Sequence, residues 1–565
     1  MCKSKALLAK QVLIGFKIHN FVMKSVICNN NPMQFSKLQT PCRRAPVSLR
    51  PLPLRHTSRR TTSWVVDTAS TAQADTLTVE QAKHAAGSEP QGPASSPSAA
   101  AAQQSGTFPW TQHWYPVAVV DDLDPARPHA THLLGIPIAL WRDKQGAWHA
   151  VEDKCPHRLA PLSEGRIESD GTLQCSYHGW QFDGRGACTH IPQLRSDDKA
   201  HQVACASRRS CVRAFPTQIV HGLLWVRPDG SAQAHEEFAR DPSPPKNALK
   251  ELLGGPEAEG WKQVTTWYVR DIPVRWDTLC ENILDPSHVP FAHHGVQGNR
   301  NNEKGTTTKL LGEVTMDGFQ FELDSNNPRI PRRTPGFSAP NHIHYRNPFR
   351  SLLVFATPTK PGWTRLISVL LKDTRLPDPP MPWFVSVVYA LKEKTPWLDH
   401  VLLRHPVLDG DNYLLHVQER LLAQEHRGDW QASYYMPAPA DGSVVAFRRW
   451  FDKFGGAVPT CEPGTPLPPL ITKRQLLDRY EQHTVNCRHC QKALRNVDVA
   501  TGLAAVAGLL AAAWLLARAM LGLPLLAPAT GLGLLAAAAA GAAVAGLRAL
   551  RQQFIFVDYV HADRH

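Results

Sequence analysis

The N-terminal segment of this chain lacks acidic residues. Residues 1–66 contain twelve lysines and arginines but no aspartate or glutamate, and the first acid is Asp67. Because this segment accounts for twelve of the formal net charge of +13, residues 67–565 carry a net charge of only +1. A basic face for nucleic acid is therefore not indicated. An acid-free leader rich in Arg, Ser and Thr is typical of an organelle transit peptide, and the alternative is a disordered basic tail.

Cysteine is also scarce, with twelve in 565 residues. Their spacing shows no disulfide framework, which excludes a small fold stapled by disulfides. Three cysteines without paired spacing are expected to be buried as small apolar side chains; they are Cys188, Cys205 and Cys211.

Two of the other cysteines are each followed closely by a histidine. Cys155 precedes His157, Cys175 precedes His178, and seventeen residues separate the two pairs. A Rieske 2Fe–2S cluster needs two cysteines on one iron and two histidines on the other. A Cys2His2 zinc knuckle is the alternative, but zinc motifs usually pair cysteine with cysteine and histidine with histidine. The mixed pairs therefore favour a Rieske cluster.

A second group of candidate ligands follows about a hundred residues later. Asp285 and His288 are three residues apart, so on a helix they would share a face. His288 and His293 are five apart, and Pro290 between them can reset the turn. Two imidazoles and a carboxylate form the facial triad of non-haem Fe(II) oxygenases. The alternatives are a pair of surface histidines, or His294 in place of His293.

The carboxylate of this triad must come from elsewhere in the chain. The best candidate is an acid pair that opens a predicted helix over Asn412–Gln424. Asp411 is our first choice and Asp409 the second, although either could instead be an N-cap.

Together the motifs resemble those of the Rieske non-haem iron oxygenases, over roughly residues 108–565. They read Cys155-Pro-His157, Cys175-x-x-His178 and Asn282-x-x-Asp285-x-x-His288-x4-His293. The phrases over 156–165 and 177–182 resemble the plastid branch, which includes pheophorbide a oxygenase, chlorophyllide a oxygenase and Rieske proteins of the import translocon. The resemblance implies an α+β fold: an antiparallel all-β Rieske domain and a helix-grip catalytic domain, in which an antiparallel sheet surrounds a helix.

The resemblance also implies how the sites cooperate. Electrons from ferredoxin would enter at the Rieske cluster and pass to a mononuclear Fe(II) that activates dioxygen. Asp285, with Asn282 in the same motif, would serve catalysis by linking a cluster histidine to His288. Relatives make this link across a subunit boundary, which implies a ring, most often a homotrimer.

The C-terminal region contains a C-x-x-C motif, Cys487 and Cys490, followed by apolar sequence. No second C-x-x-C is present, so a zinc ribbon is not expected. The resemblance implies a thioredoxin-controlled switch, and the alternative is an inert or occasional disulfide. Val499–Ala517 and Ala529–Leu547 lack charge and are long enough to span a bilayer. We expect a two-helix transmembrane anchor, with a buried soluble helix pair as the alternative.

These features predict the following organisation: transit peptide 1–66, disordered linker 67–107, Rieske domain 108–228, catalytic domain 229–475, C-x-x-C segment 476–496, transmembrane hairpin 497–550 and tail 551–565. Strands are expected at 114–120, 132–141, 147–152, 223–226, 366–371 and 383–389.

The predicted function is a ferredoxin-dependent monooxygenase of a chloroplast membrane, inner envelope or thylakoid, with its catalytic domains in the stroma. By resemblance the substrate is a chlorophyll-derived tetrapyrrole, with ring opening of pheophorbide a as the first hypothesis. The alternatives are hydroxylation of protochlorophyllide or a phyllobilin, and a non-catalytic redox sensor of the import translocon.

Overall fold

The computed structural model describes residues 106–245, 258–325, 332–377, 383–425, 428–456, 458–460, 466–524 and 526–564. The predicted transit peptide and the linker up to residue 105 lie outside these ranges.

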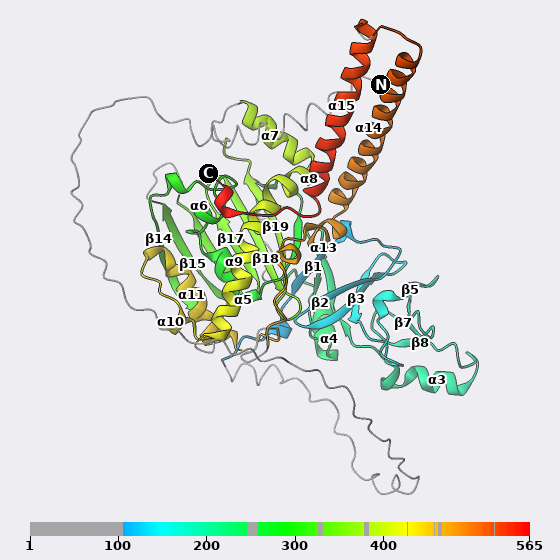
Figure 1. Ribbon diagram of the computed structural model, residues 1–565. Helices are drawn as coiled ribbons and strands as arrows, with labels where there is room; N and C mark the ends of the chain where they lie inside the picture. Colours follow the sequence, from blue (N-terminus) through cyan, green and yellow to red (C-terminus); the bar gives the residue numbers. More distant parts are fainter. Residues whose placement is uncertain are drawn as a thin grey trace, which may run out of the picture. The chain divides into compact units, whose positions relative to one another are not determined.

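The first part of the described chain is built from short antiparallel strands in three small sheets (Figure 1). One sheet contains β1 (Tyr115–Val119), β11 (Leu223–Val226) and β10 (Thr217–Val220); the second contains β2 (His129–Leu133), β3 (Ile136–Arg142), β4 (Trp148–Glu152) and β9 (Ala214–Phe215). The third contains β5 (Arg166–Ile167), β6 (Leu173–Gln174), β7 (Gln181–Phe182) and β8 (Cys188–His190). Two helices, α3 (Lys199–Ala206) and α4 (Ala232–Arg240), accompany them.

Two sequence predictions in this part are wrong. The strand expected at 132–141 is divided, because Leu134 and Gly135 have φ values of 50° and 79° and form the turn between β2 and β3. Cys211 is exposed rather than buried, since it follows the short helical turn Arg208–Ser210 at the surface.

The next part is an eight-stranded antiparallel sheet with helices on it. Its order is β12–β19–β18–β17–β16–β15–β14, and β13 also pairs with β19. The strands are β12 (Trp261–Gln263), β13 (Tyr268–Ile272), β14 (Thr306–Thr315), β15 (Gly318–Ser325), β16 (Thr334–Ser338), β17 (His342–Arg346), β18 (Arg350–Pro358) and β19 (Thr364–Asp373).

Helices α5 (Trp276–Leu284) and α11 (Gly442–Trp450) contact this sheet, and α9 (His405–Gln424) contacts α5 (Figure 1). Aromatic side chains fill the space between α5, α11 and the sheet, among them Trp276, Phe337 and Trp450. The shorter helices are α6 (Val289–Ala292), α8 (Pro396–Asp399), α10 (Trp430–Ser433), α12 (Lys473–Leu476) and α13 (Arg479–Gln482).

The strand predicted at 383–389 is wrong, because these residues begin helix α7 (Trp383–Lys394). Their run of aromatic and β-branched residues resembles a strand, but a short apolar run cannot be assigned by periodicity alone. The residues that follow, Ala-Leu-Lys-Glu-Lys, are good helix formers.

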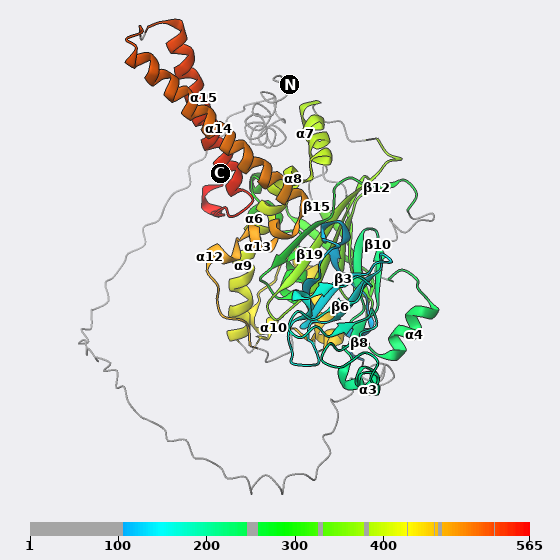
Figure 2. The ribbon, with the colours of Figure 1, turned by 90° about the vertical axis from the view of Figure 1, so that its right-hand side faces the viewer.

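The C-terminal helices α14 (Arg488–Met520) and α15 (Pro528–Gln552) lie side by side in both views (Figures 1 and 2). Each is long and apolar enough to cross a membrane. Large apolar side chains such as Leu509 and Leu532 are about two-thirds exposed, at 71% and 68%. Small residues let the helices approach: a Cβ on Gly533 would lie 2.4 Å from the ring of Trp514.

Candidate functional site

Two loops with the same backbone pattern present the predicted Rieske ligands. The amide of Cys155 donates to the carbonyl of Ala160 at 2.8 Å, and the amide of Cys175 donates to that of Trp180 at 2.8 Å. The fifth residue of each loop, Leu159 or Gly179, has a left-handed conformation with φ of 62° or 75°. Leucine is strained in this region, where glycine is not. The second loop therefore uses the residue its geometry favours, whereas the first imposes the turn on Leu159.

The loops separate the sulfur ligands from the nitrogen ligands. Cys155 and Cys175 are buried, with 2% and 1% exposure, while the rings of His157 and His178 lie nearer the surface, their centroids 4.5 Å apart. Burial raises the pKa of the Cys155 thiol to about 11, so its thiolate needs a cation nearby. Two buried thiols beside two accessible imidazoles fit a cluster with two sulfur ligands on one iron and two nitrogen ligands on the other.

The second predicted site forms where a helix is broken. Helix α5 ends at Leu284, and Asp285 is its C-cap. Pro286 explains this end, because a residue before proline disfavours the helical conformation. His288 then precedes α6, and His293 follows it directly. The prediction that Asp285 and His288 share one helix face is therefore wrong, although the break still leaves them in contact.

Helix α9 brings the carboxylate to these histidines. Among the described residues, the ligand atoms of His288, His293 and Asp411 all lie within 4.8 Å of one another. An Asp411 oxygen lies 3.8 Å from Nε2 of His288, and the other lies 3.4 Å from Nε2 of His293. Gly410 allows this approach, because a Cβ there would be 3.1 Å from the His293 ring. The donor set fits a mononuclear Fe(II) with open positions.

Asp285 contacts His288 from the other side. Its Oδ2 lies 3.6 Å from Nδ1 of His288, while its Oδ1 accepts hydrogen bonds from the amide and hydroxyl of Ser287. Burial alone would lower the pKa of His288, but the neighbouring carboxylates of Asp285 and Asp411 raise it. The Asp285 side chain remains 26% exposed, so it is partly accessible from outside the chain.

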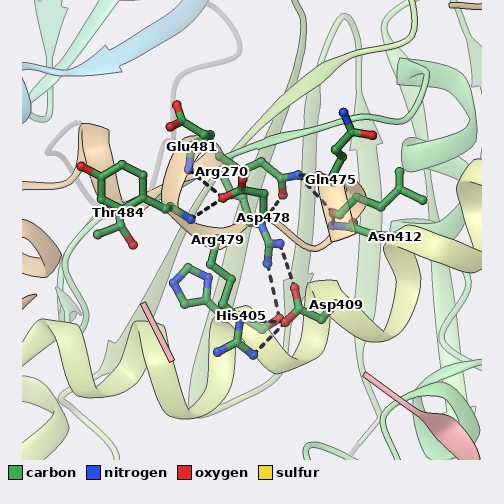
Figure 3. A network of polar contacts seen from close by, with 12 residues as sticks. Arg270, His405, Asp409, Asn412, Gln475, Asp478, Arg479, Glu481 and Thr484 are labelled. Atoms are coloured by element: carbon green, nitrogen blue, oxygen red, sulfur yellow. Dashed lines mark hydrogen bonds and ion pairs between the residues drawn. The ribbon is translucent and has the colours of Figure 1, made fainter. Parts of the chain in front are cut away.

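Asp409, the second-choice carboxylate, is held by two arginines instead (Figure 3). Its oxygens lie 2.8 Å from Nη2 of Arg270 and 2.7 Å from Nη2 of Arg479. The three side chains are almost completely buried. The side chains of Asp409 and Asp411 lie on different faces of α9, because residues two apart on a helix do not share a face.

The other candidates of this motif are placed outside the ligand group. His294 is buried, and its Nδ1 accepts a hydrogen bond from the amide of Arg300 at 3.2 Å. Asn282 lies in the last turn of α5, where its carbonyl accepts the amide of Asp285 at 3.1 Å.

The structure adds residues that the sequence reasoning missed. After α15 the tail returns to the candidate ligand group, where the Tyr559 hydroxyl donates to the carbonyl of Ala292, next to His293, at 2.8 Å. His561 is half-buried near the same group: burial lowers its pKa, the charge of Asp411 raises it and that of His293 lowers it further. The motif carried no signal for either, because both lie more than 130 residues from Asp411. At the C-x-x-C motif, buried Cys487 and Cys490 lie beside two further histidines, His400 and His483.

Comparison with known proteins finds two family models in this chain. A model of the Rieske [2Fe-2S] domain matches residues 113–216, and one described as pheophorbide a oxygenase matches residues 328–429.

Three curated relatives span most of the chain. Pheophorbide a oxygenase of Oryza sativa subsp. japonica is 36% identical, covering 92% of this chain and 98% of the relative. Flavonoid 8-hydroxylase 2 of Ocimum basilicum is 34% identical over 72% of this chain and 78% of the relative. Protochlorophyllide-dependent translocon component 52 of Arabidopsis thaliana is 30% identical over 69% of this chain and 74% of the relative. All three are chloroplastic by name. The chain therefore belongs to the family of Rieske non-haem iron oxygenases that includes pheophorbide a oxygenase.

Proposed function

We propose that this protein is a ferredoxin-dependent monooxygenase that oxygenates a chlorophyll-derived tetrapyrrole, with ring opening of pheophorbide a as the first candidate reaction. The observation that carries the proposal is the convergence of His288, His293 and Asp411 in a chain that also holds the four Rieske ligands. The substrate is taken from the name of the Oryza sativa relative, which is 36% identical and is covered over 98% of its length.

In this proposal Cys155, Cys175, His157 and His178 hold the cluster. When bound, the cluster supplies single electrons and the mononuclear iron activates dioxygen. One oxygen atom enters the product, and the other leaves as water with two electrons and two protons.

Asp285 orients the iron ligand in this proposal. Its contact with Nδ1 of His288 leaves Nε2 of that ring directed toward Asp411, as a carboxylate partner typically does for a metal-bound histidine. The accessible side of Asp285 and the exposed ring of His157 are suited to a contact between neighbouring chains. We therefore propose a homotrimeric ring in which Asp285 meets His157 or His178 of the next copy. Asn282 supports the turn that presents Asp285.

We place the enzyme on a chloroplast membrane, inner envelope or thylakoid. α14 leaves the catalytic part and α15 returns to it, where the carbonyl of Phe554 accepts the hydroxyl of Thr484 at 2.8 Å. Both ends of the hairpin thus lie on one side, which we propose is the stroma, where ferredoxin is found. A thioredoxin-controlled disulfide between Cys487 and Cys490, which the resemblance implies, is the alternative to a bound metal ion at these two thiols.

The test is incubation of the full chain in detergent with reduced ferredoxin, isotopically labelled dioxygen and a panel of substrates. The panel contains pheophorbide a, protochlorophyllide, a phyllobilin and a flavone, the last because a flavonoid hydroxylase is also a relative. Labelled oxygen in pheophorbide a and none with the Asp411→Asn variant is the expected result. Labelled oxygen in another pigment or in the flavone would identify that compound, and not pheophorbide a, as the substrate. No label in any, together with copurification of translocon subunits, would overturn the enzyme proposal in favour of a redox sensor.

A further inference from the structure

A second group of four metal-ligand side chains lies at the start of the first membrane helix. His400 begins the π-helical segment η6 (His400–Arg404), and His483 precedes η10 (Thr484–Asn486). Cys487 is the N-cap of α14, and Cys490 lies in its first turn. All four side chains are buried, with residue exposures between 0% and 4%.

The distances between the donor atoms match a tetrahedral site. Sγ of Cys490 lies 3.4 Å from Nδ1 of His400 and 3.3 Å from Nε2 of His483, and Sγ of Cys487 lies 3.8 Å from Nδ1 of His400. Zinc bonds of about 2.3 Å to sulfur and 2.0–2.1 Å to nitrogen, at tetrahedral angles, separate sulfur from nitrogen by about 3.5 Å. All four donor atoms lie within 4.8 Å of one another. An ion at their centre therefore requires only small movements.

A hydrogen bond to the main chain determines which ring nitrogen of His483 is available to bind a metal ion. Its Nδ1 is hydrogen-bonded to the main-chain carbonyl of Val269. A carbonyl can only accept, so Nδ1 carries the proton, and Nε2 has a free lone pair directed at Cys490. A metal-bound histidine typically has such an outer partner, which fixes its tautomer and ring orientation.

We propose that His400, His483, Cys487 and Cys490 bind a structural zinc ion. Two thiolates neutralise the charge of a divalent cation, and tetrahedral S2N2 donors are characteristic of zinc. Four protein donors leave no position for substrate or water, which distinguishes a structural site from a catalytic one. The burial of both thiols also limits their attack by another protein, which a dithiol switch requires.

The zinc site connects the membrane anchor to both metal-binding parts of the chain. η6 runs directly into α9, which carries Asp411. The first amide of α14, that of Arg488, donates to Oδ1 of Asp122 at 2.9 Å, and the Arg488 guanidinium lies 2.7 Å from Asp121. Both acids belong to the Rieske part, in η2 (Val120–Asp122). Zinc would therefore fix the start of α14 against the helix that presents the iron ligand.

The experiment is metal analysis of the full chain in detergent. We expect about one zinc per chain, in addition to roughly three irons for a cluster and a mononuclear site. The Cys490→Ser variant should lose at least about nine-tenths of the zinc and keep the iron of the cluster, since a closed site needs all four donors. Cys211→Ser, which changes an exposed thiol, is the matched control and should keep both metals.

X-ray absorption at the zinc edge of the unmodified protein provides a measurement that does not depend on a variant folding. Two sulfur neighbours at about 2.3 Å and two nitrogen neighbours at 2.0–2.1 Å are expected. Zinc well below one per chain in freshly purified protein, zinc retained by Cys490→Ser, or a Cys487–Cys490 disulfide found by mass spectrometry without zinc would each overturn the proposal. None of these outcomes depends on the substrate of the oxygenase.

Discussion

Replacing Asp409 with asparagine would leave two buried arginines without their shared counter-charge. Arg270 and Arg479 are 0% and 1% exposed, and both guanidinium groups lie within 2.8 Å of the Asp409 carboxylate (Figure 3). Each arginine keeps a neutral partner, Gln482 or the carbonyl of Gln553, but neither partner carries charge. Removing one member of a buried ion pair costs about 3–5 kcal/mol, because the remaining charge is left buried and uncompensated.

This loss is large enough to measure by thermal unfolding. At about 2–4 °C per kcal/mol for a domain of 150–250 residues, the Asp409→Asn variant should unfold roughly 6–20 °C below the unmodified protein. The scans are made in one detergent at one heating rate, after ferrous iron has been chelated, so that bound metal does not add to the stability.

Asp411→Asn is the matched control, because it makes the same chemical change two residues away. It should lose mononuclear iron and turnover but keep the unfolding temperature of the chelated protein within about 2 °C. The reasoning is refuted if Asp409→Asn leaves the unfolding temperature unchanged and instead abolishes iron binding, because the roles of the two carboxylates would then be exchanged.

Three further predictions follow from the described contacts. Asp285→Asn should keep cluster and mononuclear iron but slow reoxidation of the reduced cluster at least tenfold in stopped-flow measurements; loss of iron with unchanged electron transfer would contradict its bridging role. Burial raises the pKa of Glu419 to about 7 from an ordinary value of 4.5, so the folded protein binds the extra proton and stability should fall as pH rises from 4.5 to 7. Glu419→Gln should make the unfolding temperature less dependent on pH over that window, and an unchanged slope would exclude Glu419 as the cause. Gly533→Leu would drive a side chain into Trp514 and should separate the two helices of the hairpin, which lowers their protection from proteolysis in detergent. Gly541→Leu is the control and should keep that protection, because nothing lies within 4 Å of a Cβ at this position. Equal protection in both variants would show that the contact at Gly533 does not hold the helices together.

Local sequence patterns predicted the elements whose structure depends mainly on neighbouring residues. The strand at 223–226 and the apolar helices at 499–517 and 529–547 were expected from hydrophobic runs, and the structure has β11, α14 and α15 there. The strand prediction at 383–389 was wrong because the composition of this run suits either a strand or a helix, and only tertiary contacts decide between them. The break after α5 was expected at Pro290, but Pro286 acts first, at Asp285.

The motif spacings predicted two groups of candidate ligands, at Cys155–His178 and at Asp285–His293. The structure brings members of each group close together, because each pair is near in sequence. The choice between Asp409 and Asp411 could not be made in this way, since it depends on which face of α9 meets α6 and which meets two distant arginines. Likewise, the sequence showed Cys487 and Cys490 as a lone C-x-x-C, because His400 lies almost ninety residues away and joins them only when η6 packs against α14. Sequence by itself determined the candidate ligands that lie close together along the chain. Tertiary packing alone brought the carboxylate of Asp411 and the returning tail to the two histidines, and gathered the four buried side chains at the membrane helix.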